Sequence, residues 1–253
     1  MRRRFVIIAG LLIAVAMTAT AVAEAPAVGP LSGVICYPEG STEETATYVY
    51  RYSYPLLSGD SDAVAAINEN YAYMVYDAES FQVPITGESV EYLYAGQGWT
   101  NVIATVTCHT EEIFSVLVET RSDLGDGETL ILSSQTYPLT GNKAGSVTSL
   151  PYMLGILERS DEADEWLEER QAAKAQACVQ GLVWELVQDM QGDFPFYEGL
   201  TEERLNAVFY PEDDFYINAD GDYVFYIEPG TLAPEEAGAL QFTISKEDIL
   251  DEL

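Results

Sequence analysis

The spacing of apolar residues divides the first part of the chain into strand-like and helix-like segments. Residues 46–54 carry tyrosines at every second position, which predicts a strand that ends at Pro55. Residues 60–76 place apolar side chains three or four positions apart, which predicts a helix capped by Asp60 or Ser61. Strand-like runs with short links follow, so we expect antiparallel pairing among them. These runs are 89–94, 101–109, 112–120 and 129–137.

The second half of the chain has a more helical pattern. A long helix is predicted from a cap at Ser160 to about residue 191, because the acids of its first turn suit the positive end of the helix dipole. Around it we expect a short apolar helix, a helix capped by Thr201, a hairpin with its turn at 218–221 and a last strand. In chain order these are 150–157, 201–208, 214–227 and 241–245.

Strands that precede helices are typical of an α+β domain. We therefore predict an antiparallel sheet packed against one short and one long helix. Residues 24–45 are assigned to a leader and a first strand, and 24–32, rich in alanine and proline, predict a flexible segment. Residues 46–253 form the main domain. Its two intimate subregions are expected at about 46–145 and 146–253.

The tyrosines of the first predicted strand admit two interpretations. Their rings could form a platform on which sugars stack, or they could pack on a helix with their hydroxyls reaching water. Packing is the commoner use of such a stripe and is favoured. The stripe consists of Tyr48, Tyr50, Tyr52 and Tyr54.

The N-terminus has the pattern of a secretory signal. Three arginines at positions 2–4 precede an uncharged run at 5–23, which closes with small residues at 21 and 23. We expect residues 1–23 to be a signal peptide cleaved between Ala23 and Glu24, which leaves an extracytoplasmic chain without a membrane segment. The alternative is an uncleaved N-terminal membrane anchor, since the apolar run is nearly long enough to span a bilayer.

Charge narrows the choice of partners. After removal of the signal, 42 acidic residues face eight lysines and arginines, a net charge of about −34. Such a field repels nucleic acid and attracts cationic partners at a rate that falls with salt. The acids are spread among apolar residues, so the composition does not predict disorder.

Candidate reactive groups are few. Three cysteines allow one bridge, and Cys36 with Cys108 is the favoured pair because both lie in strand-like runs. The single histidine, His109, is adjacent to Cys108 in a strand, so the two side chains point to opposite faces. Residues 218–221 resemble part of a calcium loop, but the outer ligand positions fail and a hairpin turn explains them. We therefore assign no catalytic residue, no metal and no cofactor.

Three stretches together resemble a bacterial family. Tyr54-Pro55-Leu56 with Ile67-Asn68 is similar to its strand-to-helix entry, and residues 136–157 are similar to its link into the long helix. The third stretch, 215–238, is similar to its closing pattern. The chain is thus identified as similar to the extracellular domain of RsiV-like anti-sigma factors, also found beside the catalytic domain of the peptidoglycan deacetylase PdaC. The matching motif residues are Pro55, Asn68, Gly141, Phe215, Gly221, Phe225, Pro229, Pro234 and Gly238.

The resemblance implies an α+β domain facing the cell wall and a partner such as lysozyme, which RsiV binds. Two departures limit it. Only Met1 to Arg4 precede the apolar run, so we expect no contact with a sigma factor, and residues 121–127 replace a family segment that reads Gly-Gly-Ala-His. We also expect no counterpart of the deacetylase's catalytic domain.

We expect an exported, non-catalytic binding module that recognises a cationic protein or a cell-wall component. Two alternatives stay open. One is an enzyme that uses two of the many carboxylates on carbohydrate or peptidoglycan, and the other is a membrane-anchored structural envelope protein.

Overall fold

The computed structural model describes residues 25–94, 96–157 and 165–253. The expected signal peptide, its cleavage between Ala23 and Glu24, and the Ser160 cap lie outside the described residues. None of the helices in the described part combines the length and the apolar character that a membrane crossing requires.

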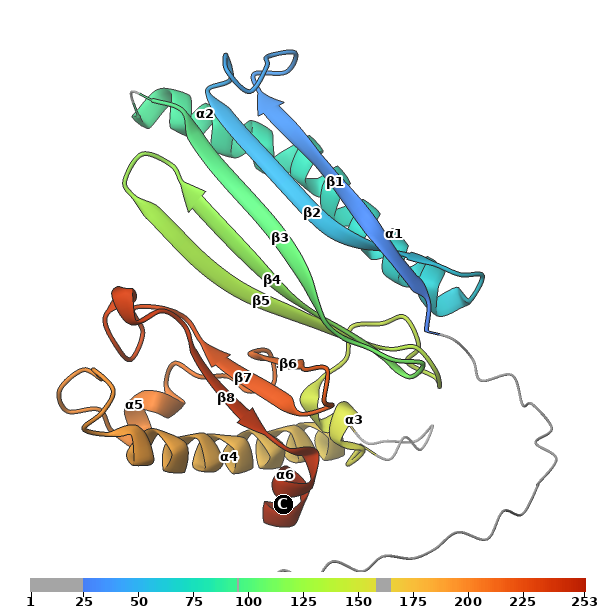
Figure 1. Cartoon of the computed structure of the whole chain (residues 1–253), viewed down its shortest axis with the longest axis vertical. Coiled ribbons are helices and arrows are strands. Elements are labelled where there is room, and N and C mark those ends of the chain that lie inside the picture. Colours follow the sequence, from blue (N-terminus) through green and yellow to red (C-terminus); the bar gives the residue numbers. More distant parts are fainter. Residues whose placement is uncertain (1–24, 95, 158–164) are drawn as a thin grey trace, which may run out of the picture.

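The chain folds as an α+β structure built around two sheets (Figure 1). The first sheet has five strands in the order β1-β2-β3-β4-β5, and the second has three in the order β6-β7-β8. The first contains β1 (Ala27–Tyr37), β2 (Tyr48–Ser58), β3 (Gly98–His109), β4 (Ile113–Asp123) and β5 (Glu128–Pro138). The second contains β6 (Phe215–Ile217), β7 (Tyr223–Ile227) and β8 (Leu240–Ile244).

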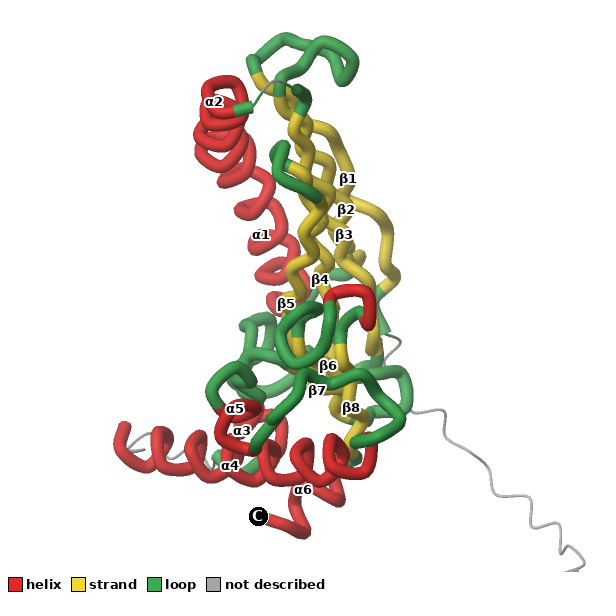
Figure 2. Tube along the Cα trace, turned by 90° about the vertical axis from the view of Figure 1, so that its left-hand side faces the viewer, coloured by secondary structure: helices red, strands yellow, loops and turns green. Residues whose placement is uncertain are grey.

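Helices cover one face of the first sheet and one side of the second (Figures 1 and 2). Helix α1 (Asp62–Asp77), a π-helical turn η1 (Ala78–Gln82) and α2 (Val83–Leu93) run continuously beside β1 and β2. In the second half, α4 (Glu165–Met190) lies across the end of the molecule under β6 to β8 (Figure 2). The short helices are α3 (Leu150–Leu154), α5 (Glu202–Asn206), the 3-10 turn η2 (Glu235–Ala237) and α6 (Lys246–Glu252).

Three sequence-based predictions about the first sheet are wrong. Residues 83–93 form a helix, not a strand at 89–94, so β2 and β3 are joined by a helical crossover and pair in parallel. Residues 27–32 belong to β1, not to a flexible leader, because they pair along their whole length with β2. Strand β2 also continues past Pro55. This proline lies beyond Ser53, the last residue paired with β3, so its missing N–H breaks no bond to that strand.

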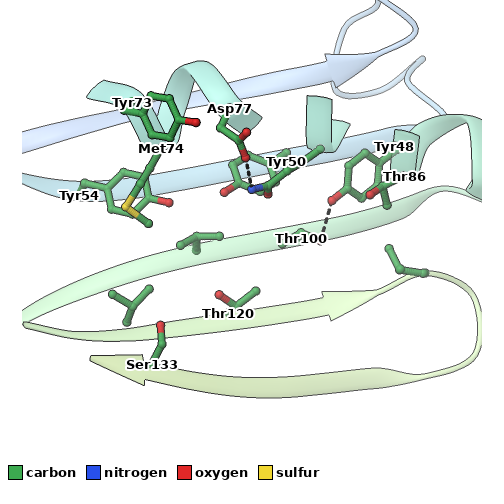
Figure 3. Close-up of a pocket in the computed structure, with 14 residues that line it drawn as sticks. Tyr48, Tyr50, Tyr54, Tyr73, Met74, Asp77, Thr86, Thr100, Thr120 and Ser133 are labelled. Atoms are coloured by element: carbon green, nitrogen blue, oxygen red, sulfur yellow. Dashed lines mark hydrogen bonds between the residues drawn. The ribbon is translucent and has the colours of Figure 1, made fainter. Parts of the chain in front are cut away.

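The first core lies between the helices and the sheet. Tyr48, Tyr50 and Tyr54 are 3–5% exposed there, so these tyrosines pack as expected, but the Tyr48 hydroxyl bonds to Thr100 and does not reach water (Figure 3). Tyr54 stacks on Tyr71 of α1 with ring centroids 5.4 Å apart. Fully buried Ile67 and Tyr71 sit four positions apart on α1, as the helical pattern requires.

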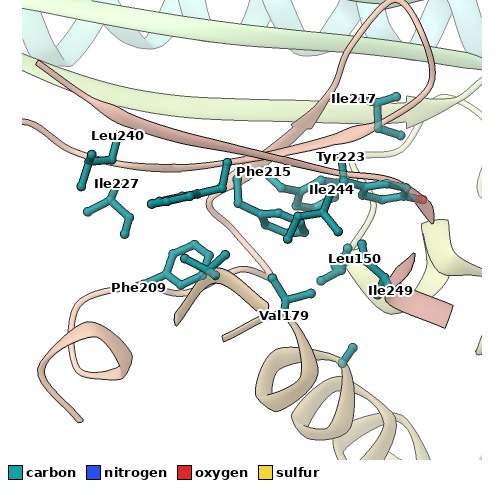
Figure 4. Packing of buried hydrophobic residues seen from close by; sticks show 14 of the residues in the cluster. Leu150, Val179, Phe209, Phe215, Ile217, Tyr223, Ile227, Leu240, Ile244 and Ile249 are labelled. Atoms are coloured by element: carbon teal, nitrogen blue, oxygen red, sulfur yellow. The ribbon is translucent and has the colours of Figure 1, made fainter. Parts of the chain in front are cut away.

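The second core is a separate cluster under the three-stranded sheet (Figure 4). Helix α4 contributes a stripe with a period of four residues, and the hairpin and β8 contribute aromatic and aliphatic side chains. Apart from Cys108, the buried members of the two clusters lie on either side of the expected 145/146 boundary. The α4 stripe is Ala175, Val179, Val183 and Val187.

Hydrogen bonds between buried groups join the two sheets. Ser115 of β4 shares a 2.8 Å hydrogen bond with Thr136 of β5, and its hydroxyl oxygen accepts one of 3.0 Å from the backbone N–H of Ile217. The Tyr226 hydroxyl donates to Ser134 at 3.2 Å. Both bonded serines lie on the face of the first sheet opposite to α1, so the second sheet docks there.

Candidate functional site

The adjacent Cys108 and His109 do not form a reactive pair. Cys108 pairs with Ser115 and belongs to the second core, whereas His109 pairs with Phe114 and packs edge-on against its ring at 5.7 Å. Burial raises the pKa of the Cys108 thiol and lowers that of His109. Both groups are therefore held in their neutral forms, the less useful ones for a thiolate nucleophile or for a charged acid.

The expected bridge between Cys36 and Cys108 is wrong, since all three cysteines are free. Cys36 pairs with Val49, and Val49 pairs with Trp99 on β3. Cys108 lies nine residues further along β3, about 30 Å away at the usual rise of a strand. Both cysteines do lie in strands, but they are far apart because they occupy opposite ends of the sheet.

The family-motif residues build the fold and do not converge on a site. Asn68 of α1 accepts a hydrogen bond from the N–H of Leu57 at 2.9 Å and donates one to its carbonyl at 2.8 Å, which fixes the helix to β2. Phe215 and Phe225 are buried in the second core. Gly221 has φ +88° in the hairpin turn, where Asn218 accepts backbone hydrogen bonds from residues 220 and 222. Pro55 lies within β2, and the remaining members lie in turns or beside element ends: Gly141 after β5, Pro229 after β7, and Pro234 and Gly238 beside η2.

An inter-sheet pocket of about 450 Å³ holds the most perturbed carboxylates. Burial raises the pKa of Asp214 to about 6, although the hydrogen bond that its carboxylate accepts from the Tyr210 N–H acts to lower this pKa. Burial raises the pKa of Glu212 as well. An acid and base pair needs pKa values pushed in opposite directions. Both shifts here are upward, so the pocket lacks that signature.

A second cavity, which we name the acidic groove, lies between α4, β8 and α6 and has a volume of about 390 Å³. Its lining combines apolar side chains, among them Leu186, which is 37% exposed, with five carboxylates. Its lining is Leu182, Glu185, Leu186 and Asp189 of α4, Thr243 and Ile244 of β8, and Asp248, Asp251 and Glu252 of α6.

The two acids that α4 contributes to the acidic groove are arranged against the stability of that helix. Glu185 and Asp189 are four residues apart on α4, a spacing at which like charges repel. They also lie near the negative end of the helix dipole, and the last turn of α4 has no basic residue. The nearby Lys246 donates its ammonium to the carbonyl of Met153 at 2.8 Å. The ion pairs of Arg51 and Arg121 lie on the first sheet and its neighbouring loop, not at the groove.

Sequence reasoning missed this groove because its acids come from segments about 60 residues apart. In a chain with 42 acids, neither segment stands out in the sequence. The available signal was local: α4 ends in two acids where a helix favours lysine or arginine.

Comparison with one solved structure supports the fold. A solved DUF3298 family protein from Bacteroides fragilis NCTC 9343 has a TM-score of 0.54 and 14% identity, with 88% of this chain and 92% of that chain covered. A DUF3298 family protein from Pseudomonas aeruginosa PAO1 has a TM-score of 0.47 and 11% identity, with 89% and 93% covered. No curated protein matches the chain. Residues 169–247 match the family model described as "Protein of unknown function (DUF3298)", so the chain is similar to that family in this segment and to one of its solved members in fold.

Proposed function

We propose that this chain is an exported, non-catalytic binding domain of the bacterial cell envelope that recognises a cationic protein. The acidic groove is the observation that carries the proposal. Five carboxylates line it together with apolar side chains, and no lysine or arginine lines it among the described residues. A basic surface would relieve the repulsion between these acids while covering exposed Leu186.

Charge and shape would have separate roles in this recognition. The net charge of about −34 on the exported chain speeds the encounter with any cationic protein, and this contribution falls with salt. The groove supplies the place where a partner docks, since charges that are desolvated beside apolar atoms are less screened than those on an open surface. A lysozyme-like protein, suggested by the resemblance to RsiV, fits this chemistry.

Binding to hen lysozyme at two salt concentrations tests the proposal. Immobilised exported chain should retain lysozyme at about 0.01 M salt, where charges interact over about 30 Å, and release it near 1 M, where the range is about 3 Å. Failure to retain lysozyme at the lower concentration contradicts the choice of partner.

The absence of catalysis is tested separately in the inter-sheet pocket. Incubation with purified cell wall should release no reducing ends. Release that is abolished by Asp214→Asn would favour the alternative of a carboxylate-dependent enzyme, because Asp214 has the most strongly raised carboxyl pKa among the described residues.

The expected export is a part of the proposal with its own test. Mass spectrometry of the natural product should find a first residue of Glu24. A chain that retains residues 1–23 in the membrane would favour the anchored alternative.

A further inference from the structure

The helical layer of the first sheet is narrower than the sheet that it covers. Helices α1 and α2 pack against β1 and β2, and the face of β4 and β5 extends beyond them (Figures 1 and 2). Register places Ser133 beside Val118, and Ile131 beside Thr120, on this same helix-side face. Ile131 is 53% exposed, so the outer part of the face is open.

A hollow of about 350 Å³ lies where the helical layer stops (Figure 3). We name it the tyrosine hollow. The buried tyrosines of β2 form one wall, β3 to β5 form the floor, and Tyr73 and Asp77 of α1 stand on the helix side. Its volume falls within the range of small-molecule sites, about 300–1,000 Å³, and its mixed aromatic and polar lining is typical of them.

Several polar groups in the tyrosine hollow have no protein partner. The hydroxyl of Tyr48 donates to Thr100 at 2.7 Å. In contrast, the side-chain hydroxyls of Thr86, Thr120 and Ser133 form no hydrogen bond with any residue that the structure describes. Three hydroxyls are therefore free to bond to a ligand or to water.

The π-helical turn adds an oriented carboxylate and amide. Residues five apart come together in a π-helix, and Gln82 donates its Nε2 amide to Asp77 Oδ2 at 2.7 Å. Both side chains line the hollow. This bond holds the carboxylate in place and leaves its other oxygen available as an acceptor.

We infer that the tyrosine hollow binds a short neutral carbohydrate, a function separate from the proposed recognition of a cationic protein. Sugar hydroxyls would bond to Thr86, Thr120, Ser133 and Asp77, while an apolar sugar face would lie on the ring of Tyr73, which is 63% exposed. These groups come from α1, α2, β4 and β5, so a ligand that reaches all of them is larger than a single hydroxyl-bearing fragment.

Other ligand classes fit less well. An apolar ligand would cover the hydroxyls and the carboxylate without bonding to them, which weakens binding because polar groups that lose water need another partner. An anion would meet Asp77, which is the sole charged side chain lining the hollow among described residues, within a strongly acidic protein.

Calorimetric titration of the exported chain with three neutral tetrasaccharides tests this inference. The probes are the β1,4-linked tetramers of N-acetylglucosamine and of glucose, and the α1,4-linked tetramer of glucose. We expect at least one to bind, and Tyr73→Ala and Thr120→Val each to weaken it about tenfold. Tyr92→Ala is the matched control, since Tyr92 is 87% exposed on α2 and does not line the hollow.

Three results would overturn the inference: no tetrasaccharide binds, binding is unchanged in both hollow variants, or a cationic amine such as spermidine binds there in place of the sugars. Thermal unfolding of each variant identifies any loss of fold, and Thr120→Val preserves side-chain shape. Retention of lysozyme should be unchanged by Thr120→Val, so failure of this inference is distinguishable from failure of the proposed function.

Discussion

The two hydrogen bonds between the Asn68 side chain and the backbone of Leu57 in β2 provide the most quantitative test of what stabilises the fold. In Asn68→Ala, the N–H and carbonyl of Leu57 lose partners at 2.9 and 2.8 Å. Leu57 is 3% exposed, so water replaces these partners poorly. Two lost hydrogen bonds at about 0.5–1.5 kcal/mol each, with part of the cost of unpaired backbone groups, give an expected loss of about 2–4 kcal/mol. That is a large share of a typical stability of about 5–15 kcal/mol.

Urea unfolding followed by far-ultraviolet circular dichroism measures this loss, with the m-value expected to be unchanged. Asn70→Ala is the control from the same helix. Asn70 donates one 2.8 Å hydrogen bond to the Tyr137 hydroxyl, which keeps its own bond to Gln135 at 2.9 Å. We expect a loss of about 1 kcal/mol or less for this variant. If Asn68→Ala loses no more free energy of unfolding than the control, the assignment of Asn68 as a stabilising link between α1 and β2 is refuted.

Three further predictions concern a carboxyl group, a glycine and the thiols. Because burial raises the pKa of Asp214 from 3.8 to about 6, the folded state favours the protonated carboxyl. The stability that this protonation contributes is fully present below pH about 4 and is lost as the pH rises through about 6. Asp214→Asn should therefore gain about 1–2 kcal/mol over wild type between pH 4 and pH 7 in urea unfolding, after allowance for partial exposure, and an equal difference at both pH values would contradict this. Gly145 has φ +79°, and an added Cβ would lie 2.8 Å from Ala63 Cα, so Gly145→Ala should lower the melting temperature more than Gly199→Ala, whose site has φ +71° and no atom within 4 Å. Thiol titration of the unfolded, unreduced chain should find three thiols, and a count of one would restore a disulfide.

The elements that the sequence predicted well are those with local signals. Ser61 and Thr201 cap α1 and α5 as expected. The expected Asn-Ala-Asp-Gly turn joins β6 and β7 into a hairpin. The α+β class was also confirmed. Each of these features depends on neighbouring residues in the chain, which a sequence displays directly.

Helix α2 was missed because tertiary packing overrides its local propensity. Val83, Ile85, Thr86 and Gly87 favour a strand or a turn over a helix. In the structure Val83, Gly87 and Val90 form the buried face, and a Cβ on Gly87 would lie 2.3 Å from the Tyr37 ring. The glycine thus allows β1 and α2 to approach closely. Since the strand at 89–94 was wrong, the expected antiparallel connection to β3 was wrong with it.

The two candidate binding surfaces depend on distant segments and could not be read from the sequence. The tyrosine stripe was visible, but the hollow exists only because the helical layer stops short of β4 and β5. The acidic groove likewise requires α6 to return beside α4. The buried stripe of α4 follows positions 175, 179, 183 and 187, whereas Ala173 and Ala177 of the same helix are exposed.

Neutralising two acids of the groove tests the proposed recognition most directly, provided that a control variant loses the same number of charges elsewhere. The variant Glu185→Gln/Asp189→Asn is compared with Glu79→Gln/Glu88→Gln, whose acids are exposed on η1 and α2. We predict that the groove variant binds lysozyme at least tenfold more weakly at about 0.15 M salt, yet gains about 0.2–0.5 kcal/mol of stability from the relieved repulsion, while the control changes affinity less than threefold. Equal weakening in the two variants would mean that net charge alone attracts the partner, and would contradict the groove as its docking site.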